Sequence, residues 1–219
     1  MKLIAHRGWA AGRDENTLAA FGRAAGDPRI AGVEFDVCRA ADAPTLLASH
    51  DPPLHVGNRP TVDAALSFLA GTDLELFVEI KQAGLAPLVI ERLVARGVAE
   101  RSVVFAFAGV ARSFPWERAR PVRLGVIVTA PWNIARVVRK HAPDVLFVGW
   151  DARAWTRMAF RGWWSAFSLD RRARRHGLPI VAGIVQRAND LDWLARQRVH
   201  GAVADIDRVF AAGDAGRAG

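Results

Sequence analysis

The chain has 219 residues, 51% of them hydrophobic, which suits one domain with a sizeable core. Its formal net charge is +8, and arginine supplies nearly all of it because only three lysines occur. The arginines are scattered, with one dense run at 171–175, whereas a nucleic-acid-binding module concentrates its charge and interleaves aromatic residues. We therefore do not expect nucleic acid as a partner.

A single cysteine, Cys38, excludes an intrachain disulfide bond and favours a reducing compartment. No apolar run approaches the roughly eighteen residues of a membrane span. The first residues lead directly into a polar motif, without the apolar region and cleavage site of a signal peptide. These features predict a cytoplasmic protein.

Short apolar runs alternate with longer amphipathic segments along the chain. The amphipathic segments repeat apolar residues at the helical period and are bounded by capping residues, prolines and glycines. We predict helices from the turn at 14–17 as far as 25, and at 62–70, 85–97, 131–141, 165–176, 189–197 and 206–212. We predict strands at 2–5, 32–38, 45–50, 74–80, 103–107, 124–128, 145–148, 180–184 and 202–204.

Strands that alternate with helices predict a parallel sheet. About eight such units in 219 residues predict one compact TIM (β/α)8 barrel with short loops. We assign residues 1–212 to this barrel and 213–219 to a C-terminal tail. The sequence does not indicate an oligomeric state.

Strand 32–38 carries two acidic residues between apolar ones, and because successive side chains point to opposite faces, Glu34 and Asp36 share one face. Glu79 and Lys81 repeat this spacing at the end of strand 74–80. Charged groups at the ends of successive strands are how a barrel builds an active site. Three carboxylates around one point predict a site for one divalent metal ion, Mg²⁺ or Ca²⁺. The alternative is a buried ion network in which Lys81 neutralises the acids.

Two histidines follow apolar runs at strand ends. His6 precedes Arg7, and His50 precedes Asp51. One imidazole can take a proton from a nucleophile while the other protonates a leaving group. Arg7 offers a bidentate fork for phosphate oxygens, and Lys81 offers a point charge. A metal, cations and two histidines together predict cleavage of a phosphate ester.

Five segments in the first 81 residues carry a resemblance to one enzyme family. In order and spacing, the sequence is similar to the signature segments of the glycerophosphodiester phosphodiesterases, whose barrel is related to that of phosphatidylinositol-specific phospholipase C. The later alternation of strands and helices fits that family's barrel more loosely. The matching segments are Ile-Ala-His-Arg-Gly at 4–8, Glu-Asn-Thr-Leu-Ala-Ala-Phe at 15–21, Val-Glu-Phe-Asp-Val at 33–37, His-Asp at 50–51 and Val-Glu-Ile-Lys at 78–81.

The resemblance implies a TIM barrel that hydrolyses glycerophosphodiesters to glycerol 3-phosphate and an alcohol, in lipid and glycerol metabolism. It implies that the three acids hold a divalent metal, that two histidines act as general acid and base, and that two cations bind the substrate phosphate. By this carry-over the metal ligands are Glu34, Asp36 and Glu79, the catalytic residues are His6 and His50, and the substrate-binding residues are Arg7 and Lys81.

The sequence departs from the family pattern at two places that affect substrate access. The insertion that commonly follows the His-Asp motif is shortened here to about 52–61, which predicts a smaller lid after the second strand. Residues 180–185 stand where relatives usually carry a Trp-Thr-Val-Asn-like strand end. These departures leave the leaving alcohol undetermined.

An aromatic stretch from Trp150 to Trp164 has two interpretations. Its tryptophans, interleaved with arginines, suit contact with a membrane surface. We favour a loop and helix that fold onto the barrel, because barrel helices also need an apolar stripe. Two further functions stay open beside the favoured one: cleavage of phosphodiesters in lipid headgroups, of the phospholipase type, and a non-catalytic basic binding module whose binding is sensitive to salt.

Overall fold

The computed structural model describes residues 1–117, 120–150, 153–167 and 175–215. The arginine run at 171–174 and the end of the expected tail at 216–219 lie outside these residues. Within them, no helix is both long enough and apolar enough to cross a bilayer.

Eight parallel strands close into a barrel, as the sequence predicts. The closure is direct, because β1 pairs in parallel with β2 on one side and with β9 on the other. A short strand β3 (Leu46–Ala48) pairs antiparallel with the end of β2 and extends the sheet above the barrel. The barrel strands are β1 (Lys2–Ala5), β2 (Gly32–Arg39), β4 (Glu75–Ile80), β5 (Ser102–Phe107), β6 (Arg123–Ile127), β7 (Val145–Gly149), β8 (Ile180–Val185) and β9 (Gly201–Ala204).

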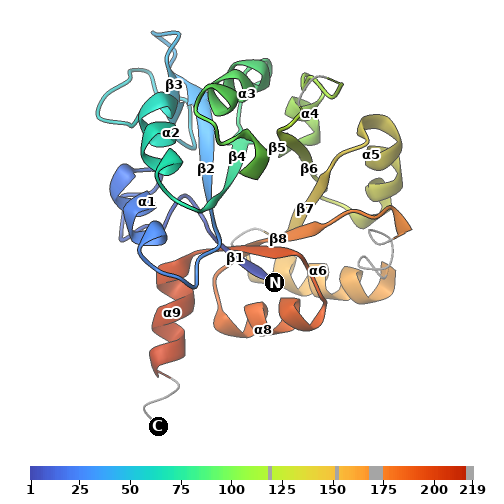
Figure 1. Cartoon of the computed structure of the whole chain (residues 1–219). Helices are drawn as coiled ribbons and strands as arrows, with labels where there is room; N and C mark the ends of the chain where they lie inside the picture. The colour runs from blue at the N-terminus through green and yellow to red at the C-terminus, as the bar shows by residue number, and fades with distance from the viewer. Residues whose placement is uncertain (118–119, 151–152, 168–174, 216–219) are drawn as a thin grey trace.

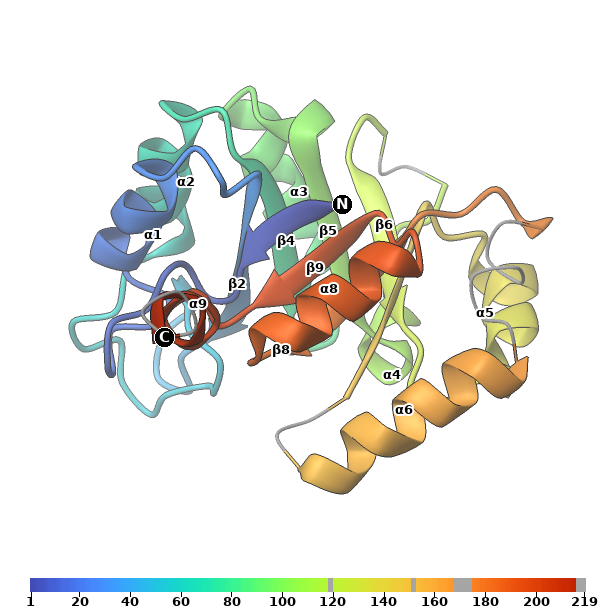
Figure 2. The ribbon, with the colours of Figure 1, turned by 90° about the horizontal axis from the view of Figure 1, so that it is seen from below.

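Helices lie outside the barrel, between the strands that they connect (Figures 1 and 2). The first two begin where the sequence predicts, because the hydroxyls of Thr17 and Thr61 accept hydrogen bonds from backbone N–H groups in the first turn. The α-helices are α1 (Leu18–Ala25), α2 (Val62–Ala70), α3 (Ala86–Ala95), α4 (Ala108–Ala111), α5 (Ile134–His141), α6 (Ala154–Phe167), α8 (Ala188–Arg196) and α9 (Ile206–Ala215), and short 3₁₀ turns occupy Ala99–Arg101 and Pro131–Asn133.

The helix expected at 165–176 falls mostly on residues 168–174, which lie outside the part of the chain that the structure describes. Its first three positions belong to α6 (Ala154–Phe167), a helix that begins earlier than the expected bounds. The Trp-rich stretch itself forms the helix because its buried residues, Phe160 and Trp164, are four apart and lie on one face. At the end of the chain α9 extends to Ala215, and the division at 212 stays a prediction.

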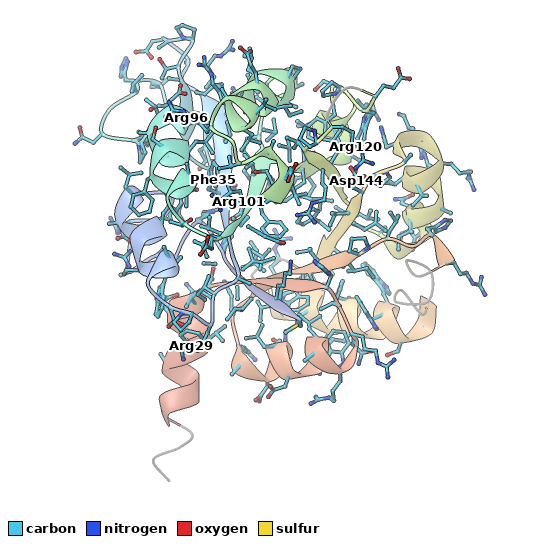
Figure 3. The ribbon with its side chains drawn as sticks, viewed as in Figure 1. Arg29, Phe35, Arg96, Arg101, Arg120 and Asp144 are labelled. Atoms are coloured by element: carbon cyan, nitrogen blue, oxygen red, sulfur yellow. The ribbon has the colours of Figure 1, made fainter. Side chains whose placement is uncertain are left out.

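Two apolar layers hold the barrel. Side chains on the outer face of the strands, such as Val33, Phe35 and Val37, pack beneath the helices; Phe35 is labelled in Figure 3. Side chains on the inner face form a separate cluster inside the barrel, in which Phe105 and Phe147 stack with centroids 3.8 Å apart. Since Val33, Phe35 and Val37 face outward, Glu34 and Asp36 face inward, as the alternation predicts.

The amino ends of the strands are fastened by ion pairs and by bonds to backbone. Arg120 and Asp144, labelled in Figure 3, pair at 2.8 Å, and the other oxygen of Asp144 accepts the N–H of Leu124 at the start of β6. Arg101, just before β5, donates to carbonyls of Leu69 and Leu74. In a TIM barrel this end provides stability, and the opposite end carries the chemistry.

The segment between β3 and α2 contains no helix, in keeping with a short insertion after the second strand. It is held to the barrel by backbone bonds from Ala41 N to Pro53 O and from Ala48 N to Pro60 O. The segment therefore forms a small loop beside the carboxyl end of β2.

Candidate active site

One end of the barrel changes from apolar to polar along three strands, β1, β4 and β9. Inner-face residues deep in the barrel are apolar: Ile4 on β1, Phe77 on β4 and Val203 on β9. Two residues further on, the same faces carry His6, Glu79 and Asp205. Because parallel strands end at the same side, these groups meet at the carboxyl end of the barrel.

The three predicted metal ligands converge. Asp36 lies opposite Glu79 in the register of β2 and β4, and Glu34 is one pleat deeper on β2. One carboxylate oxygen from each of the three lies within 4.8 Å of the others. Glu34 and Asp36 are buried and Glu79 is partly buried. The sequence thus predicted this convergence correctly.

Two cations neutralise part of this cluster. The Nζ of Lys81 is 2.9 Å from Asp36 Oδ1 and 2.7 Å from Glu79 Oε1. The Nε of Arg7 is 2.9 Å from Asp36 Oδ2, and its backbone N–H donates to Glu34 Oε2 at 2.9 Å. Both cations that we predicted to bind phosphate are therefore also partners of Asp36.

Burial and ion pairing shift the pKa values of the three acids in different directions. Burial, with repulsion from Asp36 and Glu79, raises the pKa of Glu34 well above its usual value. Burial also raises the pKa of Glu79, although Lys81 opposes this shift. Burial favours the neutral form of Asp36 too, but attraction to Lys81 and Arg7 outweighs it and lowers the pKa of Asp36.

A divalent cation fits this donor set. Glu34 Oε1 is a buried oxygen that accepts no hydrogen bond, and such an atom carries a desolvation penalty unless something pairs with it. The neighbouring donors are all carboxylate oxygens, the ligands that Mg²⁺ and Ca²⁺ prefer. A divalent cation close to Glu34 would stabilise the ionised form of this carboxylate. The residues present thus suit the predicted ion.

Asp205 is a site residue that our sequence interpretation missed. Its Oδ1 is 2.7 Å from Nδ1 of His6, and its Oδ2 accepts a hydrogen bond of 2.8 Å from Gln186. Burial opposes the charge on Asp205, but the bonds from His6 and Gln186 prevail and lower its pKa. The pattern Gly-Ala-Val-Ala-Asp at 201–205 was the available signal, because it ends a predicted strand in a carboxylate as strand 32–38 does.

The two predicted catalytic histidines differ in how firmly they are held. With Nδ1 of His6 bonded to Asp205, its Nε2 lies 4.0 Å from Glu34 Oε2. His50 is more open, since 40% of its side chain is exposed, and its Nδ1 is 3.0 Å from Oδ1 of the exposed Asp51. Both imidazoles line the same cavity.

Asn16 is a second residue whose role the sequence interpretation did not assign. It is buried, its side-chain N–H donates to Asp36 Oδ2 at 3.0 Å, and its side-chain oxygen accepts the backbone N–H of Asp36 at 3.1 Å. Glu15 beside it binds the guanidinium of Arg7 at 2.8 Å. The Glu-Asn-Thr motif thus orients Asp36, orients Arg7 and caps α1.

A sharp turn after β1 brings Arg7 to the acids. Arg7 and Gly8 have φ angles of 53° and 78°, in the left-handed region. A Cβ on Gly8 would lie 2.8 Å from Cβ of Ala20, so no larger residue fits there. The glycine lets the chain fold back against α1, which aims the Arg7 guanidinium towards the acids.

The site opens into one cavity of about 520 Å³. This size lies in the range of small-molecule sites. Its titratable lining residues all come from the first 81 residues of the chain, and Asp36 and Asp205 do not form part of the wall. The titratable lining residues are His6, Arg7, Glu34, His50, Glu79 and Lys81.

No family model and no curated protein matches the chain. Solved structures do match its fold over nearly its whole length. A phosphodiesterase from Oleispira antarctica, in complex with the product sn-glycerol-3-phosphate, has a TM-score of 0.73 at 17% identity over 98% of this chain and 97% of its own. The glycerophosphodiester phosphodiesterase of Thermotoga maritima has a TM-score of 0.67 at 22% identity over 93% of each chain.

A more distant match is the calcium-dependent phosphoinositol-specific phospholipase C of a Pseudomonas species. Its TM-score is 0.64 at 10% identity, over 92% of this chain and 87% of its own. The chain has the fold of these phosphodiesterases. At such low identities the likeness establishes the TIM barrel, and the assignment of activity rests on the site itself.

Proposed function

We propose that this chain is a phosphoric diester hydrolase that cleaves glycerophosphodiesters to glycerol 3-phosphate and an alcohol, with the help of one divalent metal ion. The observation that carries the proposal is a carboxylate triad beside one cavity that two of its acids, two cations and two imidazoles line. Further support comes from two solved structures with this fold, a glycerophosphodiester phosphodiesterase and a phosphodiesterase in complex with the product sn-glycerol-3-phosphate.

Glu34, Asp36 and Glu79 would hold the metal ion. When bound, the ion would supply positive charge for the phosphate oxygens and for negative charge that develops as the phosphate ester bond breaks. The raised pKa of Glu34 means that proton and metal compete for this carboxylate. Arg7 and Lys81 would add to the positive field around the phosphate.

His6 and His50 would move the protons. Because Asp205 accepts the hydrogen from Nδ1 of His6, the lone pair of Nε2 faces the cavity and can take a proton at that atom. His50, across the acidic cluster, is the other proton carrier within the cavity. Hydrolysis needs both a base for the nucleophile and an acid for the leaving alcohol, and two imidazoles satisfy that need.

The activity is tested by glycerol 3-phosphate release from a panel of glycerophosphodiesters with Mg²⁺, with Ca²⁺ and with a chelator. Release should require metal, and His6→Ala should lower it by about 10²- to 10⁴-fold. His55→Ala is the matched control, because His55 is 80% exposed and does not line the cavity. Release that persists in chelator and in His6→Ala contradicts the proposal.

Metal binding is tested apart from turnover by titration calorimetry with Mg²⁺ and Ca²⁺. The wild type should bind one equivalent, and Glu79→Gln should bind much more weakly. The calorimetry also identifies the preferred ion. The cytoplasmic location and the absence of a nucleic-acid partner remain predictions from composition.

If the chain were a non-catalytic binding module, it would retain its ligand in His6→Ala.

A further inference from the structure

The cavity has a second half that the phosphate chemistry does not use. Its described lining residues from Phe105 onward in the chain are all uncharged, and among them only Thr129 and Thr156 bring hydroxyls. We call these residues the apolar half; they lie on or directly after strands β5 to β9 and on α6.

The apolar half is built by the backbone as well as by side chains. Gly149 and Gly183 stand beside each other on β7 and β8, and a Cβ on Gly149 would lie 1.4 Å from the carbonyl oxygen of Gly183. A side chain on Gly149 would collide with the backbone of β8, so the glycine is required by the close approach of the two strands, and backbone forms the cavity wall at this point. Trp155 and Trp163 of α6 line the same cavity.

Two apolar residues at the edge of this half are exposed to an unusual degree. Trp155 is 62% exposed and Phe107 is 50% exposed, although both line the cavity. Large aromatic side chains left in water beside a cavity are typical of ligand-binding surfaces. They could cover an apolar group that lies in the cavity.

We infer that the substrate is a phosphodiester in which one of the two alcohols carries a large apolar group, and that this group occupies the apolar half while the phosphate lies over the acidic cluster. The inference deepens the proposed function and rests on it. Both halves belong to one cavity, so an occupant covalently attached to the phosphate reaches both. A diester with two small polar alcohols would leave the apolar half filled with water.

A cationic headgroup fits this half less well. Aromatic rings attract a quaternary ammonium, but the described residues that line this half include no carboxylate to complement it. The charge of the whole chain is +8, which also disfavours a cationic group. An uncharged chain or ring is favoured instead, since burial of each methylene changes a binding constant by about fourfold.

The test compares three substrates below their aggregation concentrations: sn-glycero-3-phosphocholine, sn-glycero-3-phospho-octanol, and the 1-octanoyl ester of sn-glycero-3-phosphocholine. The second carries the apolar group on the leaving alcohol, and the third carries it on the glycerol. We expect kcat/KM for one of the octyl-bearing substrates to exceed that for sn-glycero-3-phosphocholine by about a hundredfold or more. Which of the two is preferred identifies the alcohol that carries the apolar group.

Two variants locate the effect. Trp155→Ala should reduce kcat/KM for the preferred octyl-bearing substrate about tenfold more than for sn-glycero-3-phosphocholine. Met158→Ala is the matched control, because Met158 is on the same helix, is 70% exposed and does not line the cavity. Equal kcat/KM values for all three substrates overturn the inference. So does an equal reduction in Trp155→Ala and Met158→Ala, which would place the contact on the exposed surface of α6 and not in the cavity.

A binding measurement separates this inference from the proposed function. Octyl phosphate and methyl phosphate are titrated into the metal-loaded protein while tryptophan fluorescence is recorded. Octyl phosphate should bind at least a hundredfold more tightly, and Trp155→Ala should reduce that ratio. If no diester is hydrolysed but this ratio holds, the proposed function fails and the apolar subsite stands. If hydrolysis occurs and the ratio is near one, the apolar subsite fails.

Discussion

Asp205→Asn tests the role of the partner of His6. The carboxylate accepts the hydrogen of Nδ1 at 2.7 Å, and its other oxygen is fixed by Gln186 at 2.8 Å. An asparagine keeps the shape but can present an N–H group to Nδ1. The imidazole would then hold its hydrogen on Nε2, where it faces the cavity and cannot accept another.

The size of the effect follows from that hydrogen bond. A hydrogen bond with one charged partner contributes about 1.5–3 kcal/mol. Asp205 is 18% exposed, so water screens part of this interaction, and we take the lower half of the range. A loss of about 10- to 50-fold in kcat is expected, with little change in KM because Asp205 does not line the cavity.

Two assays distinguish a change in the orientation and tautomer of His6 from a general loss of enzyme structure. Steady-state kinetics give kcat and KM, and ¹⁵N chemical shifts of the imidazole nitrogens report which nitrogen of His6 carries the hydrogen. Asp207→Asn makes the same chemical change two residues away on the exposed side of α9 and should leave both readouts unaltered. Full kcat in Asp205→Asn, or a fall in kcat with the hydrogen still on Nδ1, would refute the reasoning.

Four further perturbations probe the charged and titratable groups of the site. In chelator, the free energy of unfolding should fall as pH rises above about 4.5, the usual pKa of a glutamate, because Glu34 in the folded chain retains a proton that it loses in the unfolded chain. In denaturant titrations, Glu34→Gln should not show this fall in unfolding free energy with pH. Metal at a hundred times its Kd should raise the wild-type Tm by about 5–10 °C, from about 2.7 kcal/mol of linkage, and should not do so in Glu34→Gln. Lys81→Gln should destabilise the chelated protein by about 3 kcal/mol in the same titrations, because it leaves Asp36 and Glu79 side by side without the cation that pairs with both. Stability equal to that of the wild type would contradict the importance of this pairing. His50→Ala should lower kcat about 10²- to 10⁴-fold with His55→Ala as control, and an unchanged kcat would remove His50 from proton transfer.

Local patterns predicted most of the barrel because each strand is a short apolar run and each helix an amphipathic one. The alternation in strand 32–38 was sufficient to place Glu34 and Asp36 on one face of the strand, and the register of β2 with β4 then brings Glu79 opposite Asp36. Neighbouring strands are also near in sequence here, so the acidic cluster follows from local information. The convergence of the three carboxylates was thus the most predictable part of the site.

Long-range pairing was not predictable from pattern alone. Asp205 is separated from His6 by 199 positions, and the two meet only because β1 pairs with β9. A single carboxylate after the short run at 201–204 is also typical of a surface turn. The start of α6 was missed for a different reason: arginines alternate with aromatic residues from Arg153 onward, and this spacing suits a loop as well as a helix.

The order of the strands predicts that the proposed proton transfer by His6 depends on closure of the barrel more than the proposed metal binding does. Glu34, Asp36 and Glu79 lie on strands that pair directly with each other, so one register fixes all three. His6 stands on β1, between β2 and β9, and its orientation needs both neighbours: Glu34 on one side and Asp205 on the other. Loosening the β1–β9 contact would therefore free the imidazole while the three carboxylates stayed together.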